Sequence, residues 1–107
     1  MFTVDFYTTP DGTIPVADWL ESLGNDKTAF RIVARLNRIT SGSFGDVKAV
    51  GEGVWELRFH FGPGYRVYYY RVGLGVVLLL CGGNKSAQKR DILAAKRHLA
   101  EFQGRTK

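Results

Sequence analysis

The chain has 107 residues with a formal net charge of +5, and 45% of the residues are hydrophobic. This length suits a single domain over residues 1–107, and the composition excludes a disordered chain. The longest apolar run, residues 76–81, is far shorter than the roughly 20 residues of a membrane-spanning helix. With one cysteine, no metal-ligand spacing and no signal-peptide pattern, we expect a cytoplasmic protein without disulfide, metal, cofactor or membrane partner.

The spacing of apolar residues along the chain predicts an α+β domain. The predicted strands cover residues 2–6, 47–50, 54–61, 65–70 and 76–81. The predicted helices lie between Thr13 and Gly24, between Gly24 and Gly42, and from Ser86 to Gly104. The order is therefore β-α-α, then antiparallel strands, then a C-terminal helix packed on a curled sheet. We expect all the helices to gather on one face of that sheet.

The charges are unevenly distributed along the chain. Five of the ten acidic residues lie within residues 1–26, which contain no Lys or Arg, so all fifteen basic residues lie after them. One side of the second predicted helix carries a basic stripe of Lys27, Arg31, Arg35 and Arg38. The stripe is either a solvated helix face or a surface for phosphates or an acidic partner.

The polar sides of the two central strands carry the residues that best fit phosphodiester chemistry. On one strand these are Glu56, Arg58 and His60, and on the next Arg66, Tyr68 and Tyr70. The hairpin turn Gly62-Pro63-Gly64 brings the two sets side by side, and we expect them on an open face. Lys85 follows the strand 76–81 after a flexible Gly-Gly-Asn bend.

Cleavage of RNA by its own 2′-hydroxyl needs a base, cations for the phosphorane and a proton source for the leaving oxygen. Three cations, Arg58, Arg66 and Lys85, could hold the phosphate. Glu56 or His60 could act as base or acid, and we expect Glu56 to be the base because the flanking Arg58 and Arg66 favour its ionised form. Tyr68 or Tyr70 could stack a nucleobase or donate a proton. The alternative is that each side chain only decorates a solvated sheet face.

Two blocks, Gly-Pro-Gly-Tyr-Arg-Val-Tyr (62–68) and Cys-Gly-Gly-Asn-Lys-Ser (81–86), stand out in the second half of the chain. Trp-Glu-Leu-Arg (55–58) precedes them and Gln-Lys-Arg-Asp-Ile (88–92) follows. Together they resemble the RelE/ParE superfamily of bacterial toxins, most closely its phage-derived, HigB-like "addiction module killer" group. The resemblance spans nearly the whole chain. It implies a microbial-ribonuclease-like fold and the toxin of a type II toxin–antitoxin pair, often an endoribonuclease that cuts mRNA in the ribosomal A site.

The resemblance also implies roles for individual residues. Arg66 matches the family arginine that contacts the scissile phosphate, and Lys85 matches the basic residue that stabilises the transition state. Glu56 and Arg58 occupy positions where ribosome-dependent relatives carry lysines or a carboxylate base. Several relatives place a Tyr or His near the start of the last helix, where this chain has neither. Here we expect Lys89 and Arg90, with Tyr68 and Tyr70, to bind the substrate.

The expected partners follow from the same resemblance. They are ribosome-bound mRNA and a cognate antitoxin, expected to be a helix-turn-helix DNA-binding protein, with operator DNA contacted only through the complex. The basic stripe is the expected contact surface for the antitoxin or the ribosome. Two alternatives stay open: a ParE-like toxin that inhibits DNA gyrase by binding, and a degenerate member that only binds its antitoxin.

Overall fold

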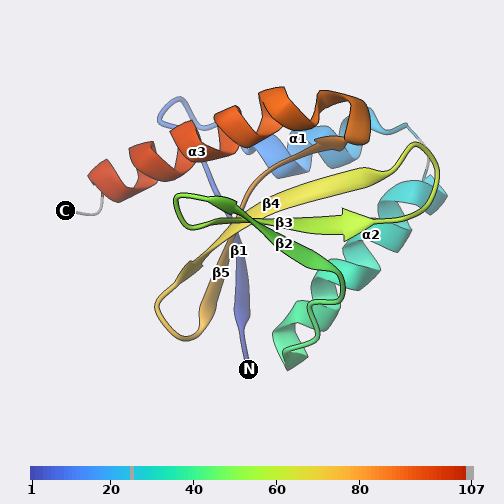
Figure 1. The fold of residues 1–107 in the computed structure, drawn as a ribbon, viewed down its shortest axis with the longest axis horizontal. Helices are drawn as coiled ribbons and strands as arrows, with labels where there is room; N and C mark the ends of the chain where they lie inside the picture. The colour runs from blue at the N-terminus through green and yellow to red at the C-terminus, as the bar shows by residue number, and fades with distance from the viewer. Residues whose placement is uncertain (25, 106–107) are drawn as a thin grey trace.

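The computed structural model describes residues 1–24 and 26–105, and Figure 1 shows their arrangement. The strands are β1 (Thr3–Phe6), β2 (Val47–Gly51), β3 (Val54–Phe59), β4 (Tyr65–Val72) and β5 (Val76–Asn84). The helices are α1 (Pro15–Ser22), α2 (Asp26–Arg38) and α3 (Gln88–Arg105), with the short 3₁₀ turns η1 (Ile39–Ser41) and η2 (Lys85–Ala87). The α+β class and the predicted order of elements are confirmed. No helix among the described residues is long and apolar enough to cross a membrane.

The five strands form one mixed sheet in the order β1-β5-β4-β3-β2. Strands β2 to β5 pair antiparallel, as predicted, whereas β1 pairs parallel to β5. The sheet twists strongly: in Figure 1 β1 stands upright while β3 lies almost horizontally. The twist and the long β5 carry the end of the sheet toward the start of α3.

Helices cover both faces of the sheet, so the expectation that they gather on one face is wrong. One core cluster packs Val16 of α1 and Leu36 of α2 against Leu57 on the sheet. The other packs Ala95 and Leu99 of α3 against the opposite face. The physical reason is visible in β5, where successive residues are apolar and buried on alternate sides. A central strand of this kind requires cover on both faces.

Gly82 permits the close packing of α1 on the end of β5. A Cβ atom at Gly82 would lie 2.7 Å from two carbons of the Trp19 ring and closer still to a third. Trp19 belongs to the core cluster on that face and also meets the ring of Tyr65 edge-on at 6.1 Å. The indole therefore has little room to retreat, and the strand needs a residue without a side chain here.

We expect Gly82→Ala to lower the free energy of unfolding by about 1–3 kcal/mol, the usual cost of forcing extra volume into a packed core. Gly75→Ala is the matched control, because no atom lies within 4 Å of its added Cβ and its φ is not positive. That control should be neutral or slightly stabilising. Urea unfolding of both variants measures the difference, and equal stability would contradict the packing argument.

Candidate functional site

A cleft of about 560 Å³ opens between the β3–β4 hairpin and the start of α3. Its lining residues are Lys48, Arg58, His60, Gly62, Pro63, Gly64, Arg66, Lys85 and Gln88. The cleft thus brings together four of the predicted catalytic residues: Arg58, His60, Arg66 and Lys85. They come from three separate segments of the chain, and their convergence gives the cleft a strongly cationic wall.

The backbone of the hairpin sets the positions of the cations. Arg58 and Arg66 are direct partners across the β3–β4 ladder, and Arg66 is in turn opposite Gly83 of β5. The amide of Lys85 donates a 2.7 Å hydrogen bond to the carbonyl oxygen of Gly64. Gly64 has φ of 80°, which favours glycine. The turn therefore fixes Lys85 beside the two arginines.

Glu56 does not lie on the open face, and that expectation is wrong. Its carboxylate is fully buried under the start of α3. Gln88 Nε2 donates a 2.7 Å hydrogen bond to Glu56 Oε2, and the Tyr68 hydroxyl donates one of 3.2 Å to the same oxygen. Glu56 Oε1 lies 3.6 Å from Arg66 Nε, and neither atom has a hydrogen-bond partner. Glu56 therefore does not line the cleft, and it contacts the cleft through Arg66 and Gln88.

The two tyrosines expected to face the substrate are placed elsewhere. Tyr68 is fully buried, and burial, together with Glu56, raises the pKa of its hydroxyl. Tyr70 is half-buried in the core cluster under α3, with its ring close to Gly53. The placement of Tyr68 on an open face is wrong because α3 covers this part of the sheet. Neither ring lines the cleft, so neither is presented for stacking there.

Asp46, which the sequence analysis missed, contacts two of the residues that line the cleft. Its Oδ2 atom accepts a 3.1 Å hydrogen bond from Arg58 Nε and a second contact from His60 Nε2. These two neighbours lower the pKa of the Asp46 carboxyl. Asp46 precedes β2 in an irregular loop, where no periodic pattern assigns a side chain to a face.

The basic stripe is interrupted, because Arg35 turns inward. Its Nη2 atom donates to the carbonyl oxygens of Asp46 at 2.9 Å and Phe44 at 3.2 Å, and Nη1 donates to the carbonyl oxygen of Arg58. The prediction of a surface role for Arg35 is therefore wrong. Lys27, Arg31 and Arg38 remain exposed, and the Arg31 guanidinium lies 3.8 Å from the centre of the Phe61 ring.

Lys89 and Arg90, the predicted substrate-binding pair near the last helix, line a second depression that adjoins the cleft. Residues 84–90 form this depression, and it shares Lys85 and Gln88 with the cleft. Both Lys89 and Arg90 are exposed, and Arg90 Nε lies 3.5 Å from Asp91 Oδ1. The structure therefore extends the cationic surface from the cleft along the start of α3.

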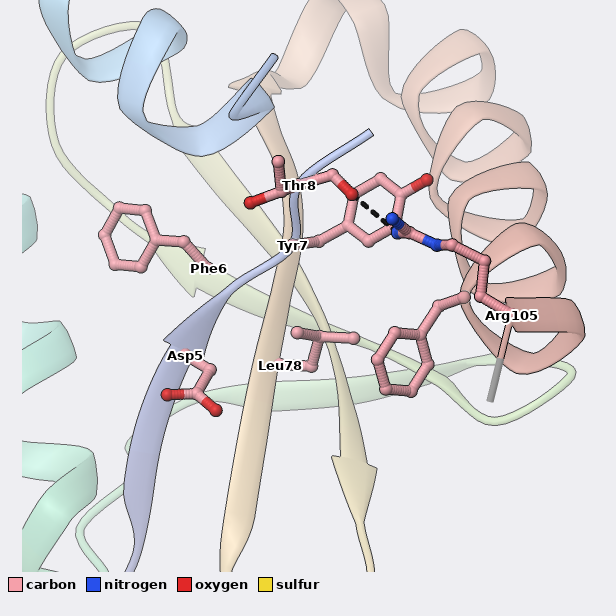
Figure 2. A pocket seen from close by; sticks show the side chains of 7 residues that line it. Asp5, Phe6, Tyr7, Thr8, Leu78 and Arg105 are labelled. Atoms are coloured by element: carbon pink, nitrogen blue, oxygen red, sulfur yellow. Dashed lines mark hydrogen bonds between the residues drawn. The ribbon is translucent and has the colours of Figure 1, made fainter. Parts of the chain in front are cut away.

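A pocket on the far part of the sheet, shown in Figure 2, has a different character. Arg105 is the basic residue of its lining, and it donates a 2.6 Å hydrogen bond to the carbonyl oxygen of Thr8 and pairs with Glu101 at 2.8 Å. The Tyr7 hydroxyl donates to the same carboxylate, and burial raises the pKa of Tyr7 to about 12. Tyr7 and Arg105 have partners within the chain, and Arg105 is the only Lys or Arg in the described lining, so we take the cationic cleft as the candidate site.

The described residues contain no cluster of three or more His, Cys, Asp or Glu side chains that could hold a metal ion. Cys81 is buried beneath α3, and this burial raises the pKa of its thiol to about 12. Its Sγ atom lies 3.5 Å from the carbonyl oxygen of Asp91. Cys81 is therefore an unreactive core side chain.

Comparison with known proteins places the chain in a family but gives it no activity. No family model matches the chain. An uncharacterized protein of Haemophilus influenzae (strain ATCC 51907 / DSM 11121 / KW20 / Rd) is 45% identical over 84 residues, which cover 78% of this chain and 85% of that protein. The chain belongs to the same family as this Haemophilus protein.

Asp91, in the first turn of α3, is a buried carboxyl group close to the cleft. It packs directly on Gly83, where an added Cβ would overlap its Oδ2 atom. Oδ2 is buried without a hydrogen-bond partner. Burial raises the pKa of Asp91, and the nearby Arg90 opposes this shift only in part. The ionised carboxylate is therefore less favourable in the folded chain than in the unfolded one.

We expect Asp91→Asn to raise the free energy of unfolding at pH 7. A raised pKa means that the wild-type chain loses stability as the pH rises above about 3.9, where the unfolded aspartate ionises. The gain from the substitution should therefore shrink as the pH falls below that value. Urea unfolding between pH 3 and 7 measures it, with the exposed Asp18→Asn as control. A loss of stability at pH 7 would show that the carboxylate itself is needed.

Proposed function

We propose that this chain is a RelE/ParE-type toxin, with the microbial-ribonuclease-like fold of that superfamily, and that its cationic cleft cleaves mRNA without a metal ion. The observation that carries the proposal is the convergence of Arg58, Arg66 and Lys85 in one cleft. The two sequence blocks that resemble the toxins contribute the turn 62–64, Arg66 and Lys85 to its lining. Resemblance and geometry thus point to the same surface.

The cleft offers the charges that phosphodiester cleavage requires. In the proposed reaction the 2′-oxygen attacks the phosphorus and the bond to the 5′-oxygen breaks. Negative charge develops on the phosphorane, where fixed cations stabilise the transition state more than the ground state. Arg66 is held from below by Glu56, so its guanidinium is already oriented before the substrate binds. Lys85 is exposed and reaches the same space from the other side.

The phosphate backbone of a single strand can continue from the cleft past Lys89 and Arg90. Adjacent phosphates of an RNA strand need a row of cations rather than one binding point. The depression formed by residues 84–90 adjoins the cleft through Lys85 and Gln88 and so provides that row. We assign Lys89 and Arg90 to the binding of a neighbouring phosphate.

The lining of the cleft also favours mRNA that is held by the ribosome. Single-stranded RNA is usually oriented by bases that stack on aromatic rings. The described lining contains no aromatic ring besides that of His60, since Tyr68 and Tyr70 lie under α3. Orientation of the nucleotide must then come from outside the chain, and mRNA fixed in the ribosomal A site meets this need.

We expect Lys85→Gln to reduce the rate of mRNA cleavage by about 10²–10³-fold, the usual effect of removing one transition-state donor. Its free energy of unfolding should not change, because the Lys85 side chain is exposed. Primer extension on mRNA in a translating extract measures cleavage, and Arg97→Gln on the exposed side of α3 is the charge-matched control.

Arg66 is a poorer choice for this test. Its removal would leave the buried Glu56 carboxylate unpaired, which typically costs about 3–5 kcal/mol.

The same assays distinguish the proposed nuclease from the two alternatives. If the wild-type chain leaves RNA intact but inhibits DNA supercoiling by gyrase, the nuclease proposal is wrong and a ParE-like toxin is favoured. A chain that does neither would be a degenerate member that only binds its antitoxin.

The proposed partner is a cognate antitoxin of the helix-turn-helix class, which would carry the complex to operator DNA. On α2 two apolar side chains, Phe30 and Val33, are exposed beside Arg31 and Arg38. An acidic amphipathic segment fits this surface, because it would cover the apolar side chains and pair with the arginines. We assign the antitoxin contact to this exposed part of α2.

Phe30→Asp combined with Arg38→Glu should leave mRNA cleavage unchanged while weakening antitoxin binding at least tenfold. Both side chains are exposed and lie outside the cleft, so the changes act on docking rather than on folding. Titration with the proposed helix-turn-helix antitoxin measures the affinity, with Leu74→Asp in the exposed β4–β5 turn as control. Unchanged antitoxin affinity would show that this part of α2 does not contact the antitoxin. Loss of mRNA cleavage would instead show that it contacts the ribosome.

A further inference from the structure

His60 lines the cleft, and Asp46 pairs with its imidazole ring. The side chain of His60 is 65% exposed, and its Nε2 atom contacts Asp46 Oδ2. The other ring nitrogen, Nδ1, has no hydrogen-bond partner among the residues that the structure describes, and it is available to a substrate. Lys48, Arg58, Arg66 and Lys85 are the remaining charged groups around the cleft. Among the described lining residues, His60 is therefore the side chain with a ring nitrogen that can accept a proton from a substrate.

We propose that His60 is the general base of the RNA cleavage and that Asp46 is its positioning residue, an inference that rests on the proposed function. A carboxylate that accepts the Nε2–H proton fixes the imidazole tautomer and leaves the Nδ1 lone pair for the substrate. Nucleophilic hydrolases of unrelated fold also use a carboxylate to orient a histidine base, with the roles of the two ring nitrogens exchanged.

The position of Asp46 is fixed by the surrounding chain. Arg35 reaches from α2 to the carbonyl oxygen of Asp46 at 2.9 Å and to that of Arg58 on β3. The loop is thereby tied to the strand that precedes His60. The Arg58 side chain donates to the same Oδ2 atom at 3.1 Å. Together these contacts hold the carboxylate ionised and aimed at the imidazole.

Glu56, the other candidate base, is poorly placed for the role. It is fully buried, and Gln88 and Tyr68 occupy Oε2 while Arg66 lies against Oε1. A 2′-hydroxyl could reach it only if the start of α3 moved. A general base must lie within hydrogen-bond reach of the proton it removes, and His60 meets this condition without rearrangement.

The proton balance of the step is simple. The proton of the 2′-hydroxyl moves to Nδ1 of His60 while the 2′-oxygen bonds to phosphorus. The bond from phosphorus to the 5′-oxygen breaks, and its electron pair leaves with that oxygen, which takes a proton from water. The resulting hydroxide then takes the proton from the imidazolium. The products are a 2′,3′-cyclic phosphate and a 5′-hydroxyl end, with no net consumption of water.

Three variants test the pair: His60→Gln, Asp46→Asn and the double substitution. We expect the single-turnover cleavage rate on mRNA-programmed ribosomes to fall at least 10²-fold for His60→Gln. For Asp46→Asn we expect a loss of at least tenfold, and the protein concentration that gives half the maximal rate should not change. The double variant should be no slower than His60→Gln alone, because Asp46 acts through His60. Asp18→Asn, on the exposed side of α1, is the matched control.

A spectroscopic measurement shows whether Asp46 positions the His60 ring or only stabilises the fold. Long-range ¹H–¹⁵N correlation spectra report the tautomer of a neutral histidine, and His98→Gln identifies the His60 signals because the chain has two histidines. We expect His60 to carry its proton on Nε2 in the wild-type chain. In Asp46→Asn this preference should be lost while the rest of the spectrum is retained.

The outcomes distinguish failure of the pair from failure of the proposed function. Full activity of His60→Gln, with activity lost in Lys85→Gln, would overturn the pair and leave the nuclease intact. Losses that multiply in the double variant would show that Asp46 acts through Arg58 instead. If the wild-type chain leaves ribosome-bound mRNA uncut, the proposed nuclease function and the proposed roles of His60 and Asp46 are both wrong.

Discussion

The buried carboxylate of Glu56 is the interaction on which the arrangement of the cleft depends. A carboxylate removed from water is costly unless it is paired and hydrogen-bonded. Here β4 supplies Arg66 and Tyr68, and α3 supplies Gln88. The same group therefore joins two strands to the start of the helix and holds the Arg66 guanidinium at the wall of the cleft. This polar cluster thus links the start of α3 to the residue that we propose as a phosphate contact, and the apolar contacts of Ala95 and Leu99 hold the rest of the helix on the sheet.

The cations of the cleft lie close enough to repel one another, and neighbouring carboxylates offset this repulsion. Arg58 and Arg66 stand directly opposite each other on paired strands, where like charges repel. Each has a separate acidic neighbour, Asp46 beside Arg58 and Glu56 beneath Arg66. Lys85 adds a cation with no carboxylate in the described lining to balance it. The cleft thus keeps an excess of positive charge, which suits a phosphate group better than a neutral ligand.

The sequence predicted the elements well because each has a strong local pattern. The period of two on both sides of Gly62-Pro63-Gly64 identified the β3–β4 hairpin, and with it the pairing of Arg58 with Arg66. Alternation also separated the two faces correctly. It could not show how far the covering helix extends along a face. Glu56 and Arg58 are consecutive on the same side of β3, yet α3 buries the first and leaves the second partly exposed.

Asp46 was overlooked and Arg35 was misplaced for the same physical reason. The positions of both side chains depend on contacts between segments that are far apart in the sequence. Asp46 lies 12 residues before Arg58 and 14 before His60, in a loop without periodicity. Arg35 fits the helical stripe by spacing, but its donors turn inward to three carbonyl oxygens. Those oxygens belong to the loop around Asp46 and to β3, neither of which has a local signature of this contact. The spacing of residues in the sequence therefore predicted the strands of the site. It did not predict that Asp46 and Arg35 hold the site together.

The described lining of the cleft has fixed cations but no aromatic ring besides that of His60. This composition affects how such a cleft would select its target. Charges fixed by β3, β4 and the turn at Lys85 would bind any phosphodiester, since phosphates carry no sequence information. Discrimination must then arise from how the nucleotide is presented. Presentation by the ribosome would position one phosphate against preformed donors, so the chain need supply only charge and a proton acceptor. In that proposal the buried Glu56 cluster supplies the oriented Arg66, and the exposed His60 supplies the proton acceptor.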